Sequence, residues 1–141
     1  MTQITDIVGE ARSLRSDDTL RSLMEALRTS PQTVFPVLDD KERVVGTVSE
    51  LDLVRLLDPS EPTLSFGPGK LIRAGLVSDV EDIMTRRPTT ISIDEPLHAA
   101  AKKMETMRLP QLIVVDKDKR LKGLLRGRDV FLALFEDQGD E

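Results

Sequence analysis

The stretch Gly46-Thr47-Val48-Ser49-Glu50-Leu51-Asp52 decides how this chain is organised. It predicts a β-strand that passes through a short turn into a helix, with a carboxylate in the first turn of that helix. The stretch Gly123-Leu124-Leu125-Arg126-Gly127-Arg128-Asp129 repeats the pattern, and 123 minus 46 and 129 minus 52 both give 77. The constant offset indicates one structural unit that is written twice.

The duplication extends to the helices that precede these stretches. An apolar stripe at helical spacing occurs in each half, and each member recurs at the same offset. We expect Met24 of the first stripe to fill the core. Acidic residues stand ahead of both helices, at Asp17-Asp18-Thr19 and at Asp94-Glu95-Pro96, where they favour helix capping. The stripes are Leu20, Leu23, Met24 and Leu27 in the first half and Leu97, Ala100, Ala101 and Met104 in the second.

Each half is predicted to contain a short helical lead-in, a short strand, a helix, a hairpin of two strands and a last helix. Pro36 lacks an N–H donor, which predicts that its strand is an edge strand or is irregular there. In the first half these elements are expected at 5–8, 12–15, 20–27, 33–38, 43–48 and 49–57, and in the second at 80–84, 89–93, 97–104, 112–115, 120–125 and 126–134.

The predicted organisation is a first repeat over 1–60, a linker over 61–79, a second repeat over 80–136 and a frayed acidic tail over 137–141. Prolines and glycines break the linker, in which 70–73 is expected to form one helical turn. Neither repeat is large enough to close a core alone. We therefore expect an α/β (α+β) fold in which two β-α-β-β-α repeats pack sheet against sheet about a pseudo-twofold axis. Clefts between repeats are favoured ligand sites.

Composition excludes several classes of function. The net charge of −5 and the 3% aromatic content argue against a nucleic-acid surface. The chain has no Cys and one His, which argues against thiol chemistry and against a Cys or His metal site. Its N-terminus does not resemble a signal peptide and no apolar run reaches about 18 residues. We expect a cytoplasmic protein with no membrane insertion, no metal site and no catalytic residues, and we expect His98 at the surface.

Several short motifs, in this order, resemble those of a known family. The second half contains Asp82-Ile83-Met84-Thr85, Ile91-Ser92-Ile93-Asp94-Glu95-Pro96-Leu97 and Ile113-Val114-Val115-Asp116, followed by Gly123 and Asp129. The first half contains Phe35-Pro36-Val37-Leu38-Asp39 and then the opening stretch. Together they resemble a CBS domain pair, or Bateman module, that covers nearly the whole chain.

The resemblance implies a non-catalytic regulatory module that binds an adenosine-containing ligand, AMP, ADP, ATP or S-adenosylmethionine, in the clefts between repeats. It implies no other cofactor. It also implies a homodimer and a regulated enzyme or transporter as partner. The alternative is a structural dimerisation or interaction module whose clefts bind nothing.

The ligand motif of the family, Gly-x-x-Ser/Thr-x-x-Asp, matches Gly46, Ser49 and Asp52. A carboxylate accepts two hydrogen bonds from adjacent ribose hydroxyls, and a helix start offers free N–H groups to a phosphate. The same Ser-x-x-Asp spacing is also explained by helix capping alone.

The second half keeps Gly123 and Asp129 but has Arg126 in place of Ser or Thr. Arg126 and Arg128 are candidate phosphate ligands, although Arg126 is equally consistent with a side chain that fills the cleft or pairs with an acid. The resemblance places the contacts to the base near the short strands, and the candidates there are Leu14, Thr89, Thr90 and Ile91.

Overall fold

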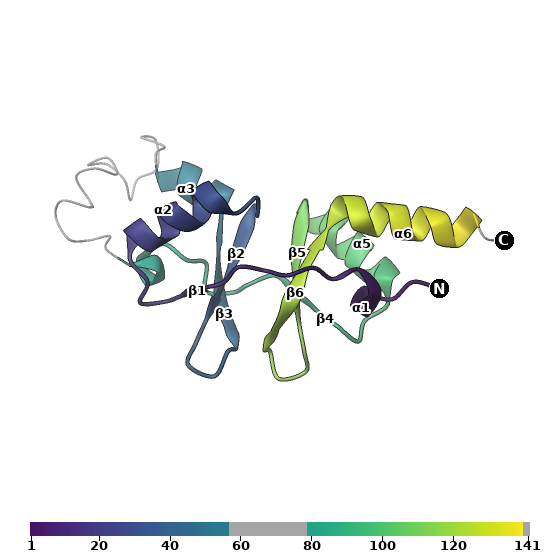
Figure 1. The fold of residues 1–141 in the computed structure, drawn as a ribbon, viewed down its shortest axis with the longest axis horizontal. Coiled ribbons are helices and arrows are strands. Elements are labelled where there is room, and N and C mark those ends of the chain that lie inside the picture. Colours follow the sequence, from purple (N-terminus) through teal and green to yellow (C-terminus); the bar gives the residue numbers. More distant parts are fainter. Residues whose placement is uncertain (57–78, 140–141) are drawn as a thin grey trace. The chain divides into compact units, whose positions relative to one another are not determined.

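The structure is a computed structural model that describes residues 1–56 and 79–139 (Figure 1). It contains two three-stranded sheets, each accompanied by helices, and the expected α/β fold class is confirmed. The predicted linker lies outside the described residues except for Asp79, and so does the helical turn expected at 70–73.

The order of elements repeats from the first half to the second, as the sequence predicts. Each half has a short lead-in helix, a short strand, a helix, a hairpin and a last helix. The first half consists of α1 (Ile4–Ile7), β1 (Leu14–Arg15), α2 (Leu20–Thr29), β2 (Val34–Leu38), β3 (Val44–Ser49) and α3 (Glu50–Leu56). The second consists of η2 (Val80–Asp82), β4 (Thr90–Ser92), α5 (Leu97–Met107), β5 (Gln111–Val115), β6 (Leu121–Arg126) and α6 (Gly127–Gly139).

Both sheets are built in the same way. The order is β1-β2-β3 in one and β4-β5-β6 in the other, with a parallel pair between the first two strands. Leu14 pairs with Val37 and Ile91 pairs with Val114, and both residues of the second pair follow those of the first at the offset found in the sequence. The duplication read from the sequence is therefore a duplication of structure.

Pro36 lies in a central strand, so of the two predicted alternatives, an edge strand or an irregular one, the edge strand is wrong. β2 has β1 on one side and β3 on the other. The pairing with β1 covers Val37 and Leu38 alone, because β1 has two residues. Pro36 precedes that paired stretch, so its missing N–H removes no bond to β1.

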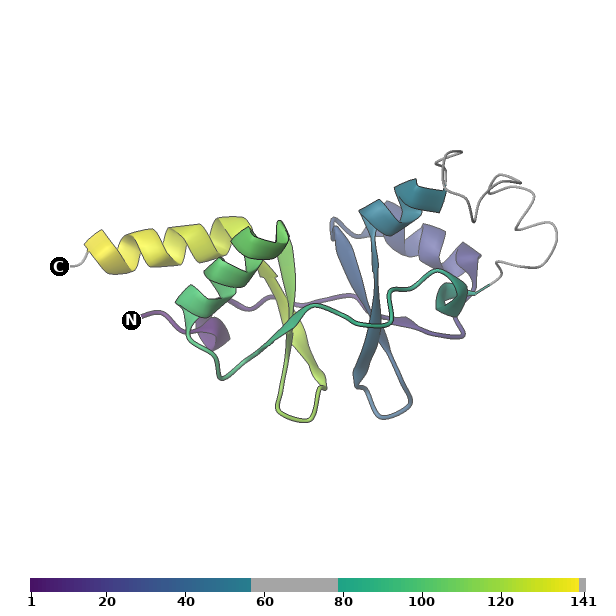
Figure 2. The same cartoon turned by 180° about the vertical axis from the view of Figure 1, so that it is seen from behind.

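The chain folds into two compact units that do not coincide with the two sequence repeats. We call them the Asp52 unit (Arg12–Asp39 and Val45–Pro88) and the Asp129 unit (Met1–Ala11, Asp40–Val44 and Thr89–Glu141). The lead-in helix of each repeat thus belongs to the unit that holds the sheet of the other repeat. Figure 2 shows η2 in the Asp52 unit and α1 in the Asp129 unit.

Each unit has an apolar core, to which the exchanged lead-in contributes one fully buried side chain. Val80 lies in the core of the Asp52 unit and Ile4 in that of the Asp129 unit. Burial of such a side chain is worth about 1.5–3 kcal/mol, which fixes the lead-ins in place. The first core is formed by Leu14, Leu23, Ala26, Phe35, Val37, Val48 and Val80. The second is formed by Ile4, Ile91, Leu97, Ala100, Met104, Leu112, Val114, Leu125, Val130 and Ala133.

The helices that precede the hairpins differ from expectation in two respects. Met24 is 49% exposed, so its predicted place in the core is wrong; α2 buries Leu23 and Ala26 instead. The acids ahead of the helices do not cap them. Thr19 caps α2 by accepting a bond from the Ser22 N–H at 3.2 Å, whereas Pro96, the residue before α5, forms no side-chain cap.

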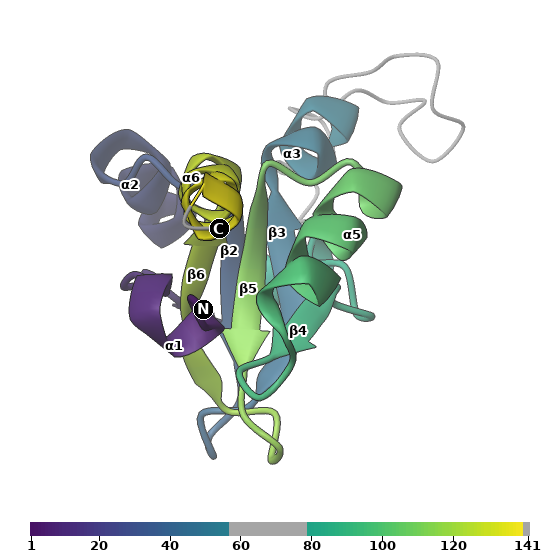
Figure 3. The same ribbon diagram turned by 90° about the vertical axis from the view of Figure 1, so that its right-hand side faces the viewer.

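The last helix is longer than predicted. α6 continues to Gly139, beyond the expected end at Leu134 and through part of the tail that was expected to fray. Asp137 accepts hydrogen bonds from the backbone N–H of Thr2 at 2.9 Å and from its hydroxyl at 3.0 Å. These bonds, the first of them above all, hold the pKa of Asp137 below its ordinary value. Figure 3 shows α1 and α6 in the same unit, and α5 beside β4 and β5.

No helix among residues 1–56 and 79–139 combines the length and the apolar character that a membrane crossing requires.

Candidate functional site

Asp52 lies in the first turn of α3, where its carboxylate is held by the residue that precedes the helix. The Ser49 N–H donates to Asp52 Oδ2 at 2.9 Å, and the Asp52 N–H donates to Ser49 Oγ at 3.2 Å. This is a reciprocal cap, so the capping interpretation of the Ser-x-x-Asp spacing holds in the structure. Asp52 stays half-exposed, which leaves its lone pairs accessible to a ligand.

A third residue, which the sequence analysis did not assign to the site, also reaches Asp52. The Thr85 hydroxyl donates to the Asp52 carboxylate, with its Oγ1 at 3.3 Å from Oδ1 and 3.4 Å from Oδ2. Thr85 is exposed and follows the lead-in helix η2. The signal for it was present, because Thr85 ends the Asp82-Ile83-Met84-Thr85 motif. Ser49, Asp52 and Thr85 thus form a cluster of two hydroxyls and one carboxylate, which we call the first site.

Gly46 brings the lead-in segment close to β3. The Thr47 N–H donates to the Thr85 carbonyl at 3.0 Å, and the Thr85 N–H returns a bond of 2.8 Å. A Cβ on Gly46 would lie 2.8 Å from both Met84 Sδ and the Thr85 carbonyl oxygen. Gly46 is also buried. Its structural role is therefore to permit this approach.

In the second half, Arg126 and Asp129 stand at the positions that correspond to Ser49 and Asp52, and Gly9 lies beside Arg126. We call these three residues the second site. The Gly9 and Leu124 backbones exchange two hydrogen bonds of 2.9 Å. A Cβ on Gly123 would lie 2.3 Å from the Gly9 carbonyl oxygen, and Gly123 has a φ of 156°. Arg126 ends β6 and Asp129 lies in the first turn of α6; both are half-exposed, whereas Arg128 is exposed.

The residues expected to contact a base divide into two kinds. Leu14 and Ile91 are 3% and 5% exposed and belong to the cores, so their side chains pack internally. Thr89 and Thr90 are half-buried, and the Thr90 carbonyl accepts a bond of 2.6 Å from Lys103 Nζ. Contacts from Leu14 or Ile91 to a ligand would have to come from the backbone.

Other features of the described residues do not coincide with these sites. A cavity of about 500 Å³ in the Asp129 unit is lined by residues of the chain start, the β4–α5 connection, the first turn of α5 and α6. The exposed His98 of α5 is one of them. None of the predicted ligand residues lines this cavity. Within residues 1–56 and 79–139, no three or more His, Asp or Glu side chains gather in a way that would hold a metal ion.

Comparison with protein families gives one match in each half. The model of the CBS domain matches residues 4–59 and 80–136. These ranges contain Gly46 and Gly123, Asp52 and Asp129, and the lead-in helices α1 and η2.

Solved structures of CBS-domain pairs have the same fold. CBSX2 from Arabidopsis thaliana, a CBS-pair protein, is 27% identical with a TM-score of 0.74 and 96% coverage of both chains. A crystal structure of CBSX2 in complex with AMP gives a TM-score of 0.77 at 26% identity and covers 98% of this chain and 99% of that one. A CBS domain pair in complex with 5′-methylthioadenosine and S-adenosyl-L-methionine is 22% identical with a TM-score of 0.68, which shows the fold alone.

Similar segments also occur inside longer proteins. Homoserine O-acetyltransferase from Methanohalobium evestigatum is 28% identical over 128 residues, which are 90% of this chain and 22% of that enzyme. The chain thus spans about a fifth of the length of this relative.

Proposed function

Because the chain belongs to the CBS domain family, we propose that it is a non-catalytic regulatory module that binds an adenosine-containing ligand, with Asp52 as the acceptor for the ribose hydroxyls. The observation that carries this proposal is the state of the Asp52 carboxylate. It already accepts one N–H and one hydroxyl bond at the start of a helix. A ribose presents hydroxyl donors of the same kind as Thr85, so the diol can take the place of the threonine hydroxyl.

The relatives support the choice of ligand class. CBSX2, with the same fold at 26% identity, has been crystallised with AMP. Similar segments make up about a fifth of an acetyltransferase, which fits a module that modifies the behaviour of a partner rather than one that performs the chemistry. Ligand binding would act on an enzyme or transporter by favouring one of two conformations.

The proposal assigns a role to each predicted residue. Ser49 and Asp52 bind the sugar, and Gly46 holds the lead-in next to them. Gly123 and Asp129 hold the equivalent places in the second site, where Arg126 and Arg128 contribute positive charge. The candidates for contacts to the base are Leu14 in β1, Thr90 and Ile91 in β4, and Thr89, which directly precedes β4.

The test is a calorimetric titration with AMP, ADP, ATP and S-adenosylmethionine, followed by the same titration of Asp52→Asn. Hydrogen bonds to a charged acceptor are worth about 1.5–3 kcal/mol, so we expect the Kd at this site to rise by about tenfold or more. Asp6→Asn is the matched control, because Asp6 Oδ2 accepts the Gln3 N–H at 2.8 Å in the same kind of cap. If none of the four ligands binds at millimolar concentration, the proposed function is wrong.

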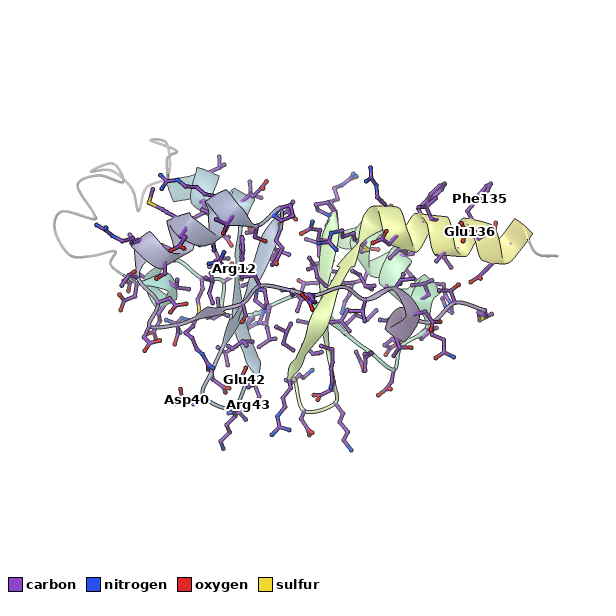
Figure 4. The ribbon with its side chains drawn as sticks, in the orientation of Figure 1. Arg12, Asp40, Glu42, Arg43, Phe135 and Glu136 are labelled. Carbon is purple, nitrogen blue, oxygen red and sulfur yellow. The ribbon has the colours of Figure 1, made fainter. Side chains whose placement is uncertain are left out.

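A second candidate function, dimerisation, is favoured by the exposed face of α6. Phe131 and Phe135 are each 64% exposed, and their rings stack with centroids 5.8 Å apart. They border an apolar groove of about 440 Å³ between α5 and α6. Figure 4 labels Phe135 on this helix. The chain has four Phe in total, so two of them on one exposed face is a large share.

We propose a second copy of this chain as the occupant of that face. The two rings are part of the lining of the groove, so a twofold axis would pack this face of one copy against the same face of the other. Sedimentation velocity of Phe131→Ser combined with Phe135→Ser is expected to show monomers where the unaltered chain dimerises. Glu136→Gln, a change at the exposed neighbour, is the matched control. A monomeric unaltered chain at about 100 µM, well above the Kd of a stable interface, would contradict this candidate.

A further inference from the structure

Gly9 and Thr85 hold equivalent places in the two units. Each exchanges two backbone hydrogen bonds with the strand that leads into the site helix, Gly9 with Leu124 and Thr85 with Thr47. Thr47 and Leu124 are themselves equivalent, because each directly follows the glycine of its stretch, Gly46 or Gly123. The second site therefore has a bare α-carbon where the first has a threonine side chain.

The guanidinium of Arg126 fills the space that the missing side chain leaves. Its Nη1 lies 3.1 Å from the position that a Cβ on Gly9 would take. Arg126 itself stands where the first site has Ser49. The two hydroxyls that contact Asp52 in the first site are thus replaced in the second by a single cation.

This cation has no acidic partner in the part of the chain that the structure describes. No carboxylate among residues 1–56 and 79–139 lies within ion-pair distance of the Arg126 guanidinium. The side chain is half-buried, so part of its hydration is lost without a compensating charge. An anion with several acceptor oxygens would supply the missing negative charge, and a guanidinium binds such oxygens in pairs.

We propose that Gly9 and Arg126 act together as the specificity determinant of the second site, where they select a phosphorylated ligand such as AMP over adenosine. The first site, with Ser49, Asp52 and Thr85, offers hydroxyls and a carboxylate and does not make this distinction. The inference rests on the proposed function, because it assumes that adenosine-containing ligands enter both sites.

The experiment measures the Kd of AMP and of adenosine by calorimetry in an Asp52→Asn background, in which the second site dominates. We expect Arg126→Gln to weaken AMP binding by about tenfold, the size of one charge-assisted interaction, and to change adenosine binding by less than about twofold. Lys122→Gln is the matched control, because it removes one exposed positive charge from the same strand. Equal changes for AMP and adenosine, or none for either, would overturn the proposal.

The role of Gly9 is tested by exchange of the pair. Gly9→Thr combined with Arg126→Ser gives the second site the residues of the first, and the preference for AMP over adenosine should fall to about one. If the exchanged protein keeps the preference, Gly9 and Arg126 do not determine it. Gly9→Ala requires the flexible end of Arg126 to shift by a few tenths of an ångström, and it should lower the preference only in part.

Inorganic phosphate separates this inference from the proposed function. In protein labelled with ¹⁵N-arginine, the Arg126 Nε–Hε signal is assigned by its absence from the Arg126→Gln spectrum. The signal should shift on addition of phosphate but not of chloride at equal ionic strength. If AMP does not bind and phosphate shifts this signal, the proposed function is wrong and the anion subsite stands. If AMP binds and phosphate leaves the signal unmoved, the subsite is wrong and the function stands.

Discussion

The first and second sites differ at the residues that face the proposed ligand position and agree at the residues that hold the backbone there. A lead-in segment packs closely against Gly46 in one site and against Gly123 in the other. Asp52 and Asp129 both lie in the first turn of a helix. Ser49 and Thr85 in one site correspond to Arg126 and Gly9 in the other. The glycine positions are thus constrained by close backbone packing, whereas the side chains that we propose face the ligand differ as a pair between the two sites.

The two glycines give the largest expected effect. Gly123→Ala places a Cβ 2.3 Å from the Gly9 carbonyl oxygen at a φ of 156°, so backbone must move. We expect a loss of about 3 kcal/mol in the free energy of unfolding, measured with urea. Gly46→Ala places its Cβ 2.8 Å from Met84 Sδ, which is a flexible side chain, and from the Thr85 carbonyl oxygen. Its loss should be smaller, about 2 kcal/mol.

Gly127→Ala is the control for this pair. Its Cβ would have its nearest contact at 3.3 Å, and the residue begins a helix. The effect should stay within about 0.5 kcal/mol. A greater loss from Gly46→Ala than from Gly123→Ala would show that the lead-in is held more rigidly in the Asp52 unit than the comparison implies.

A smaller effect is expected at the caps of the helices that precede the hairpins. Thr19 and Pro96 hold equivalent positions, but only Thr19 caps its helix: its side-chain hydroxyl oxygen accepts a hydrogen bond from the Ser22 backbone N–H. Thr19→Ala should cost about 1 kcal/mol, the usual value of such a cap. Pro96→Ala removes no cap and should cost about half as much, through the greater freedom of the unfolded chain. Equal losses in urea titrations would indicate that the Thr19 bond contributes nothing.

The smallest effect is the pH dependence of the contact that anchors α6. The Thr2 N–H holds the pKa of Asp137 below its ordinary value of about 3.9. A lowered pKa in the folded state means that the bond stabilises the protein above that value and is lost as the pH falls through the lowered pKa. The difference in Tm between the unaltered chain and Asp137→Asn should be present at pH 6 and shrink below about pH 3.9. A constant difference across this range would contradict the assignment.

Much of the architecture could be predicted because its signals are local. The alternation of strands and helices, their doubling at a constant offset and the cap at Ser49 and Asp52 are each written within a few neighbouring residues. Burial was less predictable. Met24 belongs to an apolar stripe, but the residues of α2 that are buried in the core are Leu23 and Ala26. Periodicity alone does not show which of two adjacent apolar residues is buried.

The sequence shows the motif that ends at Thr85, but it does not show which distant segment contacts each site. Thr85 reaches Asp52 from a different repeat, through a bridge between Thr47 and Thr85. The match between Gly9 and Thr85 is also hidden by a change of register. The capping acids of the lead-ins, Asp6 and Asp82, are one position closer together than the offset at which the strands and later helices repeat.

The most direct test of two unlike sites is the ratio of AMP to adenosine affinity, measured by calorimetry at each site alone. Asp52→Asn leaves the second site, and Asp129→Asn leaves the first. We predict that AMP binds about tenfold more tightly than adenosine in Asp52→Asn, and about equally with it in Asp129→Asn. The same ratio in both variants would contradict the account, because the exchange of Ser49 and Thr85 for Arg126 and Gly9 would then have no effect on what the sites bind.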